Sequence, residues 1–224
     1  ATCRPPCAAC SASNRARMQY LDIARLDAAP LGNDPCVHVH VPGFVRAGAL
    51  AAINRDYPDI RERGNFPPEE LAYGAAFAGL LEELRSEGLR AAFERKFGID
   101  LQQNPLQITA RKYVDETDSG LHNDSRTKVV TVLMYFNEQW EHAGGKLRLT
   151  RTEQDFEDYT VECEPAQGNL IAFVRSATSF HGYLPCNAER RSIQMYWVKA
   201  KREQRDAGRA GTVLKRLKRF FKRG

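Results

Sequence analysis

The most informative stretch of the sequence runs from residue 120 to residue 136 and reads GLHNDSRTKVVTVLMYF. Its second half is rich in β-branched residues and is typical of a strand. Its first half contains His122 and Asp124, two residues apart. On a strand, side chains at this spacing point the same way, so one imidazole and one carboxylate can approach a single metal ion. The motif alone is short and occurs often by chance, so further ligands are needed to make a site.

His181 is the candidate for the third ligand. It lies 57 residues after Asp124, and the interval has room for four or five short strands, enough to wrap around a barrel and return. Two histidines and one carboxylate on one face of a metal are the ligand set of non-haem Fe(II) oxygenases. These residues therefore predict an iron site.

The segment after His181 predicts a carboxylate receptor. It reads HGYLPCNAERRSIQMYW, and Arg190 begins a strand on which it shares a face with Ser192. A planar guanidinium beside a hydroxyl is suited to bind the carboxylate of an organic co-substrate. Arg191 competes for this role, but its parity on the strand points it to the opposite face.

The order of the remaining elements predicts the fold. A half-buried strand is expected at 36–44, helices at 47–54, 68–87 and 89–97, and an ordered loop or lid at 56–68. Gly98 is expected to stop the last helix. From residue 106 the period changes to that of strands, expected at 106–114, 129–136, 146–150, 160–164, 169–173 and 192–198. Helices followed by short antiparallel strands predict a double-sheet roll or barrel supported by helices.

Taken together, these motifs resemble the 2-oxoglutarate- and Fe(II)-dependent dioxygenases, and most closely the prolyl 4-hydroxylase-like branch. The resemblance covers about residues 106–198. It lies in five short motifs: Tyr113-x8-His122-x-Asp124, Met134-Tyr135-Phe136-Asn137, Gly144-Gly145-Lys146-Leu147-Arg148, Gly168-x-Leu170-x-x-Phe173 and His181-x8-Arg190-x-Ser192.

The resemblance implies a mainly β (α+β) fold, a double-stranded β-helix or jelly roll supported by N-terminal helices. It implies that His122, Asp124 and His181 hold Fe(II), and that 2-oxoglutarate and O2 are co-substrates. It also implies where 2-oxoglutarate binds. Its distal carboxylate would pair with Arg190, helped by Tyr135 and Ser192, in a cavity that Tyr113 also lines.

Strand parity agrees with this arrangement. If Tyr135 faces inward, Thr131 and Leu133 do so too, and the outward residues pack against helices: Val130, Val132, Met134 and Phe136. An inward Tyr113 likewise turns Arg111 inward. Arg111 is then a candidate for substrate recognition, with a structural ion pair as the alternative.

Several other residues have weaker functional readings. Arg126 lies beside the H-x-D motif together with Ser125 and Lys128, and a basic mouth would suit an anionic sugar acid or phosphorylated glycan. His38 and His40 share a strand face and could bind a second metal, although such residues are more often half-exposed and locally hydrogen-bonded. The six cysteines are expected to be isolated thiols, because C-x3-C-x2-C at residues 3–10 is one ligand short of a zinc site.

Charge divides the chain into a body and a tail. The 224 residues carry a formal charge of +5, but residues 199–224 alone contribute +9 and the rest −4. We expect three parts: an extension at 1–17 before Met18, a single dioxygenase domain at 18–200, and a basic amphipathic tail at 201–224. Within the domain, helical support is expected at 45–100 and the jelly-roll core at 106–198. Bulky apolar residues among the Lys and Arg of 213–223 favour a helix on an anionic membrane surface. The alternatives are a helix packed on the domain, a frayed solubilising tail, and a contact with nucleic acid or another partner. The expected location is the cytoplasm, with the tail at the inner face of the membrane.

The composition and motifs define the competing functions. A hydrophobic content of 42% excludes a disordered chain. The first hypothesis is an oxygenase that hydroxylates an unactivated C–H bond and releases succinate and CO2, with a small-molecule, saccharide or cell-envelope substrate. The alternatives are a peptidyl hydroxylase of the prolyl type and a non-catalytic metal-binding sensor or scaffold. Nucleic acid is not expected as a partner, since the body has no basic stripe with interleaved aromatics.

Overall fold

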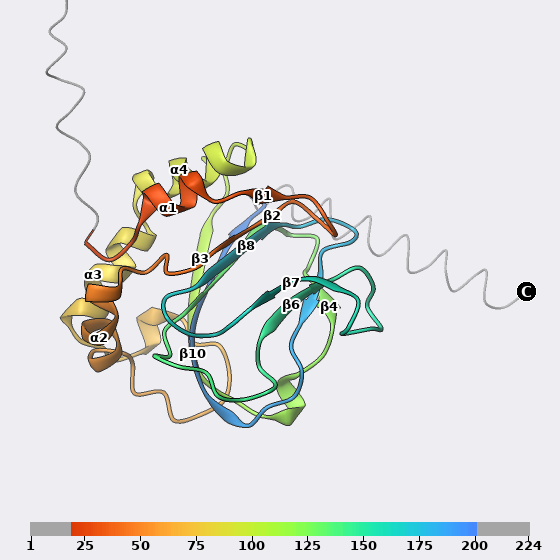
Figure 1. Ribbon diagram of the computed structural model, residues 1–224. Helices are drawn as coiled ribbons and strands as arrows, with labels where there is room; N and C mark the ends of the chain where they lie inside the picture. The colour runs from red at the N-terminus through yellow and green to blue at the C-terminus, as the bar shows by residue number, and fades with distance from the viewer. Residues whose placement is uncertain (1–18, 201–224) are drawn as a thin grey trace, which may run out of the picture.

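Two antiparallel sheets and a layer of helices make up the computed structural model, which describes residues 19–200 (Figure 1). The extension and the basic tail expected at the two ends lie outside the described residues. The larger sheet has the strand order β1-β2-β8-β5-β10-β3, and the smaller sheet has the order β4-β9-β6-β7. The expected mainly β jelly roll supported by N-terminal helices is confirmed.

The helices are α1 (Ile23–Ala28), α2 (Ala47–Arg55), α3 (Ala75–Leu84) and α4 (Glu87–Phe97), with short 3-10 turns η1 (Pro68–Glu70) and η2 (Glu116–Asp118). The strands are β1 (Leu31–Gly32), β2 (His38–Val41), β3 (Leu106–Val114), β4 (His122–Asn123), β5 (Lys128–Tyr135), β6 (Leu147–Thr150), β7 (Tyr159–Cys163), β8 (Leu170–Val174), β9 (Phe180–Gly182) and β10 (Ala188–Val198).

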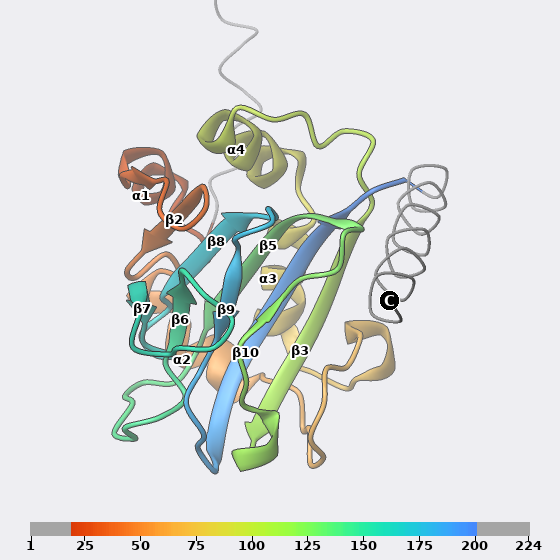
Figure 2. The ribbon, with the colours of Figure 1, turned by 90° about the vertical axis from the view of Figure 1, so that its right-hand side faces the viewer.

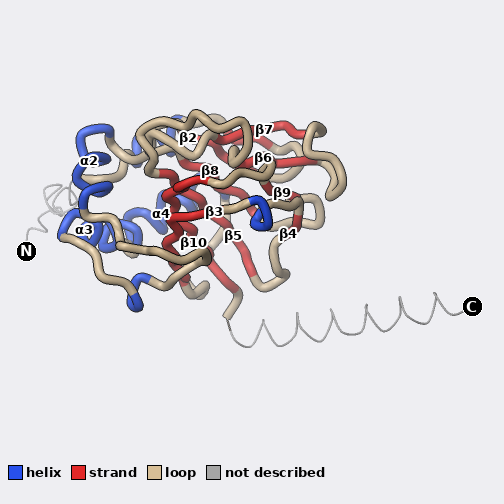
Figure 3. Tube along the Cα trace, turned by 90° about the horizontal axis from the view of Figure 1, so that it is seen from below, coloured by secondary structure: helices blue, strands red, loops and turns tan. Residues whose placement is uncertain are grey.

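The larger sheet separates two apolar clusters. The helix-side core lies between this sheet and the helices, which all cover one face of it (Figure 3). The barrel core lies between the two sheets. Residues of β5 enter the two clusters alternately, as predicted: Val130, Val132 and Met134 join the helix-side core, and Leu133 and Tyr135 join the barrel core. The inner face of β5 therefore faces the same interior as the small sheet.

The long strands β10 and β3 run side by side at the edge of the large sheet (Figure 2). A bulge between Glu189 and Ser192 interrupts their register. Beyond it, Ser192 lies opposite Arg111 on β3 and opposite Tyr135 on β5. Arg190 and Ser192 are thereby brought to the wall of the barrel core.

The helix predicted at 68–87 is wrong in its first part, and it also ends early, since α3 stops at Leu84 and Glu87 begins α4. Only residues 68–70 form a 3-10 turn, residues 71–74 are not helical, and α3 begins at Ala75. The break has a tertiary cause, because Asp56 fixes the helix start from the end of α2. Its carboxylate accepts the Ala76 N–H at 2.8 Å, and its carbonyl accepts the Gly74 N–H at 2.9 Å. A helix continuing through Gly74 would lose both contacts.

Residues 56–67, expected as an ordered loop or lid, cover part of the outer edge of β3. Phe66 and Ala110 exchange both backbone hydrogen bonds, at 3.0 and 2.9 Å. The loop thus behaves as a short extra strand at this point and protects an edge that would otherwise expose unpaired backbone groups.

The half-exposed position expected for His38 is wrong, whereas that expected for His40 is confirmed. His38 is buried and His40 half-buried, since their face of β2 points into the barrel, opposite Phe173 and Ile171. The Nδ1 of His38 donates locally to the Cys36 carbonyl at 2.9 Å. Neither histidine belongs to a three-ligand metal cluster among residues 19–200. Both edges of β2 are also paired, because β1 and β8 lie on either side of it in the sheet.

The three cysteines that the structure describes, Cys36, Cys163 and Cys186, are buried free thiols, as expected. Burial raises the pKa of the Cys163 thiol to about 12, and of the Cys36 thiol likewise. None of the helices within residues 19–200 has the length and apolar character needed to cross a bilayer.

Glu83 of α3 anchors the beginning of the described chain. Its carboxylate accepts backbone N–H groups from Gln19, Tyr20 and Leu21. We expect Glu83→Gln to lower the free energy of unfolding by about 1–3 kcal/mol, because the amide has one oxygen acceptor where the carboxylate has two. Urea denaturation measures the difference. Glu82→Gln, at the exposed neighbouring position, serves as the control and should change stability by less than about 0.5 kcal/mol.

Candidate metal and co-substrate site

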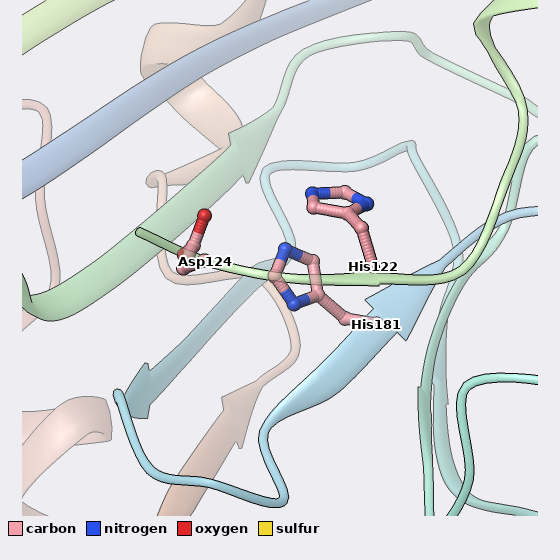
Figure 4. Close-up of side chains that lie close together, drawn as sticks. All are labelled: His122, Asp124 and His181. Atoms are coloured by element: carbon pink, nitrogen blue, oxygen red, sulfur yellow. The ribbon is translucent and has the colours of Figure 1, made fainter. Parts of the chain in front are cut away.

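The two short strands β4 and β9 bring the proposed metal ligands together. They pair antiparallel, and His122 lies directly opposite His181. Asp124 follows β4 immediately, so it stays on the same side as His122. One ligand atom from each residue lies within 4.8 Å of the others, and Figure 4 shows the three side chains converging. Among residues 19–200 this is the group of three potential ligands that is compact enough for one ion.

The two histidines are oriented by backbone carbonyls. The Nδ1 of His181 donates to the Ser179 carbonyl at 3.0 Å, and the Nδ1 of His122 lies 3.4 Å from the Gly120 carbonyl. A carbonyl only accepts, so Nδ1 carries the proton and Nε2 keeps its lone pair for a metal. Burial lowers the pKa of His181 to about 4, against the opposing pull of Asp124. His181 is therefore a neutral ligand at physiological pH.

Asp124 is a buried carboxylate with both oxygens engaged. Its Oδ1 lies 2.6 Å from the Lys128 ammonium, and its Oδ2 accepts the Thr131 hydroxyl at 2.5 Å. Burial alone would raise the pKa of Asp124, but His181, Lys128 and the Thr131 hydroxyl together hold it below its usual value. The carboxyl group is therefore ionised, as a metal ligand must be.

Neighbouring polar groups hold the backbone of the H-x-D motif. The side-chain amide of Asn123 donates to the Ser176 and Ala177 carbonyls, and its oxygen accepts the Ser179 hydroxyl at 2.8 Å. Arg175 donates to the Asp124 carbonyl at 3.2 Å. These contacts tie β4 to the turn before β9, which keeps the ligands in register.

Arg190 is a second buried charge in the barrel, and the residue is 1% exposed. Its Nε donates to the Gly145 carbonyl at 2.8 Å and its Nη2 to the Tyr135 hydroxyl at 3.0 Å. Its guanidinium carbon lies 4.7 and 4.5 Å from the ring centroids of Tyr135 and Tyr183. Within residues 19–200, no carboxylate lies within salt-bridge distance of it. A buried cation without an anion is costly, so the pocket favours an anionic ligand.

Two hydroxyl groups near Arg190 strengthen this inference. The Ser192 Oγ and the Tyr183 OH are buried, and neither has a hydrogen-bond partner among the described residues. Burial raises the pKa values of Tyr135 and Tyr183, although Arg190 partly opposes this, so both phenols stay protonated and able to donate. Unsatisfied donors around a buried guanidinium are what a carboxylate-binding pocket provides.

Arg191 points away from this pocket, as its parity predicted. Its guanidinium pairs with Glu189 at 2.5 Å and donates to the Asn54 side chain at 3.0 Å. It also lies above the ring of Tyr57, which belongs to the helix-side core. Arg191 therefore links the sheet to α2 and does not compete with Arg190.

The other predicted site residues lie in different surroundings. Arg111 is buried and forms an ion pair with Asp118 at 2.5 Å, which is the structural alternative that the sequence left open. Tyr113 is half-buried, with the Lys112 ammonium 5.5 Å from its ring centroid. Arg126 is exposed beside the H-x-D motif. The substrate roles proposed for Arg111 and Arg126 remain predictions.

Sequence reasoning missed Tyr183 as a neighbour of Arg190, and it missed the two contacts to the carboxylate of Asp124. A signal existed for Tyr183, because it lies two residues after His181 and so shares its strand face. Thr131 was placed on the inner face of β5, but its bond to Asp124 depends on the turn between β4 and β5. No local sequence pattern predicts the hydrogen bond between Thr131 and Asp124.

Comparison with known proteins now identifies the fold and chemistry. Residues 108–199 match the family model of the 2OG-Fe(II) oxygenase superfamily. The match extends from β3 to β10. The matched residues include the ligand cluster and Arg190. The oxygenase is therefore a 2-oxoglutarate-dependent dioxygenase, and the expected Fe(II), 2-oxoglutarate and O2 are confirmed as its cofactor and co-substrates.

Two solved structures share the fold of the oxygenase. A prolyl-4-hydroxylase from Pseudomonas putida is 19% identical with a TM-score of 0.53, covering 79% of this chain and 90% of that one. A prolyl 4-hydroxylase from Phytophthora capsici is 18% identical with a TM-score of 0.53, covering 80% of this chain and 66% of that one. At these identities the likeness concerns the jelly-roll fold. No curated protein matches the chain significantly.

Proposed function

We propose that the oxygenase hydroxylates an unactivated C–H bond at the mouth of its barrel. In this proposal His122, Asp124 and His181 hold Fe(II), and Arg190 binds the distal carboxylate of 2-oxoglutarate. The observation that carries the proposal is that a metal-ligand cluster and a carboxylate receptor lie in the same barrel. A His-Asp-His cluster lies within 4.8 Å, and a guanidinium without a carboxylate partner is buried in the same barrel.

The bound iron and 2-oxoglutarate supply the oxidation: with O2, the C–H group becomes C–OH while 2-oxoglutarate becomes succinate and CO2. The protein's own residues position these groups. Thr131 fixes the plane of the Asp124 carboxylate, and Ser179 fixes the ring of His181. Arg190, Tyr135 and Ser192 would orient the co-substrate, and Tyr113 is proposed to line the same cavity.

A non-catalytic sensor or scaffold is a poorer explanation for this arrangement. A metal-binding scaffold requires the three ligands but has no use for a carboxylate receptor. In a scaffold, the buried Arg190, whose guanidinium lies near two tyrosine rings, would lower stability and have no ligand to bind. The buried guanidinium therefore favours an enzyme that binds a keto acid.

We propose an anionic saccharide or cell-envelope intermediate as the substrate. His122 is exposed, so the metal site opens to solvent on its side. Lys128 and Arg126 lie beside the same motif, and a basic mouth attracts anionic groups. A peptide is the alternative, because the two solved relatives described above are prolyl hydroxylases.

A screen by mass spectrometry tests the proposed reaction. We expect a substrate from an anionic glycan panel to gain one oxygen atom, and the gain to require both Fe(II) and 2-oxoglutarate. A peptide panel containing proline is run in parallel, with succinate release measured in each reaction. Product formed only from peptides would overturn the saccharide proposal. Product formed equally by His181→Ala would overturn the site assignment.

A further inference from the structure

Lys128 is the cation closest to the proposed metal ligands. Its ammonium lies 2.6 Å from Oδ1 of Asp124 and 3.6 Å from the centroid of the Tyr196 ring. Its side chain is 21% exposed, while that of Asp124 is 4% exposed. The ammonium thus sits on a buried carboxylate but keeps access to solvent.

The other oxygen of Asp124 is already committed. The Thr131 hydroxyl donates to Oδ2 from the buried inner face of β5, where Thr131 is 2% exposed. The rigid strand holds this bond, whereas a lysine side chain can move through several rotatable bonds. Of the two contacts to Asp124, the one made by Lys128 is therefore the easier to displace.

A divalent cation at the ligand cluster would meet Lys128 as a competitor. Both cations are attracted by the single negative charge of Asp124, and they repel each other at close range with little screening in a buried site. The ammonium already lies over the face of Tyr196, and this contact can be kept when the ion pair with Asp124 is broken. The Tyr196 ring therefore stabilises the ammonium with or without its ion pair to Asp124.

We propose that Lys128 competes with the metal for Asp124 and thereby weakens metal binding, making it readily reversible. This inference rests on the proposed function, because it takes His122, Asp124 and His181 as the metal ligands. Lys128 is a positioning residue here, acting on the metal through Asp124. Its effect is on metal affinity and does not require turnover.

Equilibrium titration with Mn(II) alone tests the proposal, with the free ion measured by electron paramagnetic resonance. We expect Lys128→Met to bind Mn(II) at least about tenfold more tightly than the unaltered protein, since a like charge beside the site is removed. Lys128→Arg keeps the positive charge beside Asp124 and should stay within about threefold of the unaltered protein. Lys128→Gln gives a second neutral variant, and thermal melting verifies that each protein is folded.

Lys146→Met is the matched control. It removes the same charge from a lysine that pairs loosely with Glu162, at 3.8 Å, outside the ligand cluster. Unchanged or weaker Mn(II) binding in both neutral Lys128 variants would overturn the inference, as would an equal gain in Lys146→Met. These results differ from failure of the proposed function, in which the unaltered protein and His181→Ala would bind Mn(II) equally.

Discussion

His181→Ala should bind Mn(II) at least about a hundredfold more weakly than the unaltered protein and should release no succinate from 2-oxoglutarate above background. Loss of a supporting group around a metal typically costs about 10- to 100-fold in affinity, so loss of a direct ligand should cost more. The protonation state and the orientation of the His181 ring are also well defined. It is 4% exposed, neutral at physiological pH and held by Ser179 with Nε2 available.

Asp124→Ala should have an equally large effect for an added electrostatic reason. Without the carboxylate, the Lys128 ammonium would remain beside the metal site with no negative charge between the two cations. Metal titration and succinate release measure both variants. His142→Ala, which removes an exposed histidine packed against Trp140, is the control and should match the unaltered protein.

Normal activity in either variant would contradict the assignment of His181 and Asp124 as metal ligands. If His181→Ala or Asp124→Ala kept normal succinate release while folded, the metal would have to bind elsewhere. Because His181 packs against Phe173 with ring centroids 4.6 Å apart, His181→Gln is a useful second variant that leaves a smaller cavity. Thermal melting of the metal-free proteins separates loss of ligation from loss of fold.

Arg190→Met should abolish high-affinity binding of 2-oxoglutarate while leaving metal binding within a few-fold of normal. A charge-assisted hydrogen bond contributes about 1.5–3 kcal/mol, so losing two of them costs about 3 kcal/mol or more. The dissociation constant for 2-oxoglutarate should therefore rise at least about a hundredfold. Calorimetric titration of the Mn(II)-loaded protein measures this without turnover.

Arg190→Met should change the free energy of unfolding far less than it changes the affinity for 2-oxoglutarate. Arg190 has no carboxylate partner within residues 19–200, so its removal leaves no buried anion unpaired. We expect the free energy of unfolding to change by less than about 1 kcal/mol, since replacing a buried charge by an apolar side chain is often neutral. Arg190→Lys should recover only part of the affinity, because an ammonium cannot form the two parallel bonds of a guanidinium.

Arg191→Met is the matched control for Arg190→Met. Its guanidinium faces Asn54 and Tyr57 on the helix side of the sheet, so its removal should lower stability and leave 2-oxoglutarate binding intact. The reverse pattern, with affinity lost in Arg191→Met and retained in Arg190→Met, would show that the co-substrate pocket has been misplaced.

The parts of the site that depend on local periodicity could be predicted from the sequence. His122 and Asp124 share a side because residues two apart on a strand do so, and the same rule separates Arg190 from Arg191. The alternation of β5 between the helix-side core and the barrel core follows from the same geometry. The end of helix α4 was predicted as well, since Gly98, with φ of 67°, ends it. Its start was missed, because Ser86, which caps it, was expected to lie inside a helix at 68–87.

Elements without a repeating pattern could not be predicted. Strands β4 and β9 have two and three residues, too few for periodicity to appear, although they carry both histidines of the site. The break before α3 was missed because Asp56, twenty residues earlier than Ala76, defines where the helix begins. Short pairing segments depend on contacts far along the chain.

Local sequence therefore determined the strand faces, the inward Arg190 and the separation of a mildly acidic body from a basic tail. Tertiary structure alone decided that His122 lies opposite His181, that Tyr183 covers Arg190, and that Lys128 reaches Asp124. The physical reason is that side-chain direction depends on the dihedral angles of a few adjacent residues. Contact between distant segments depends on sheet register and burial across the whole barrel.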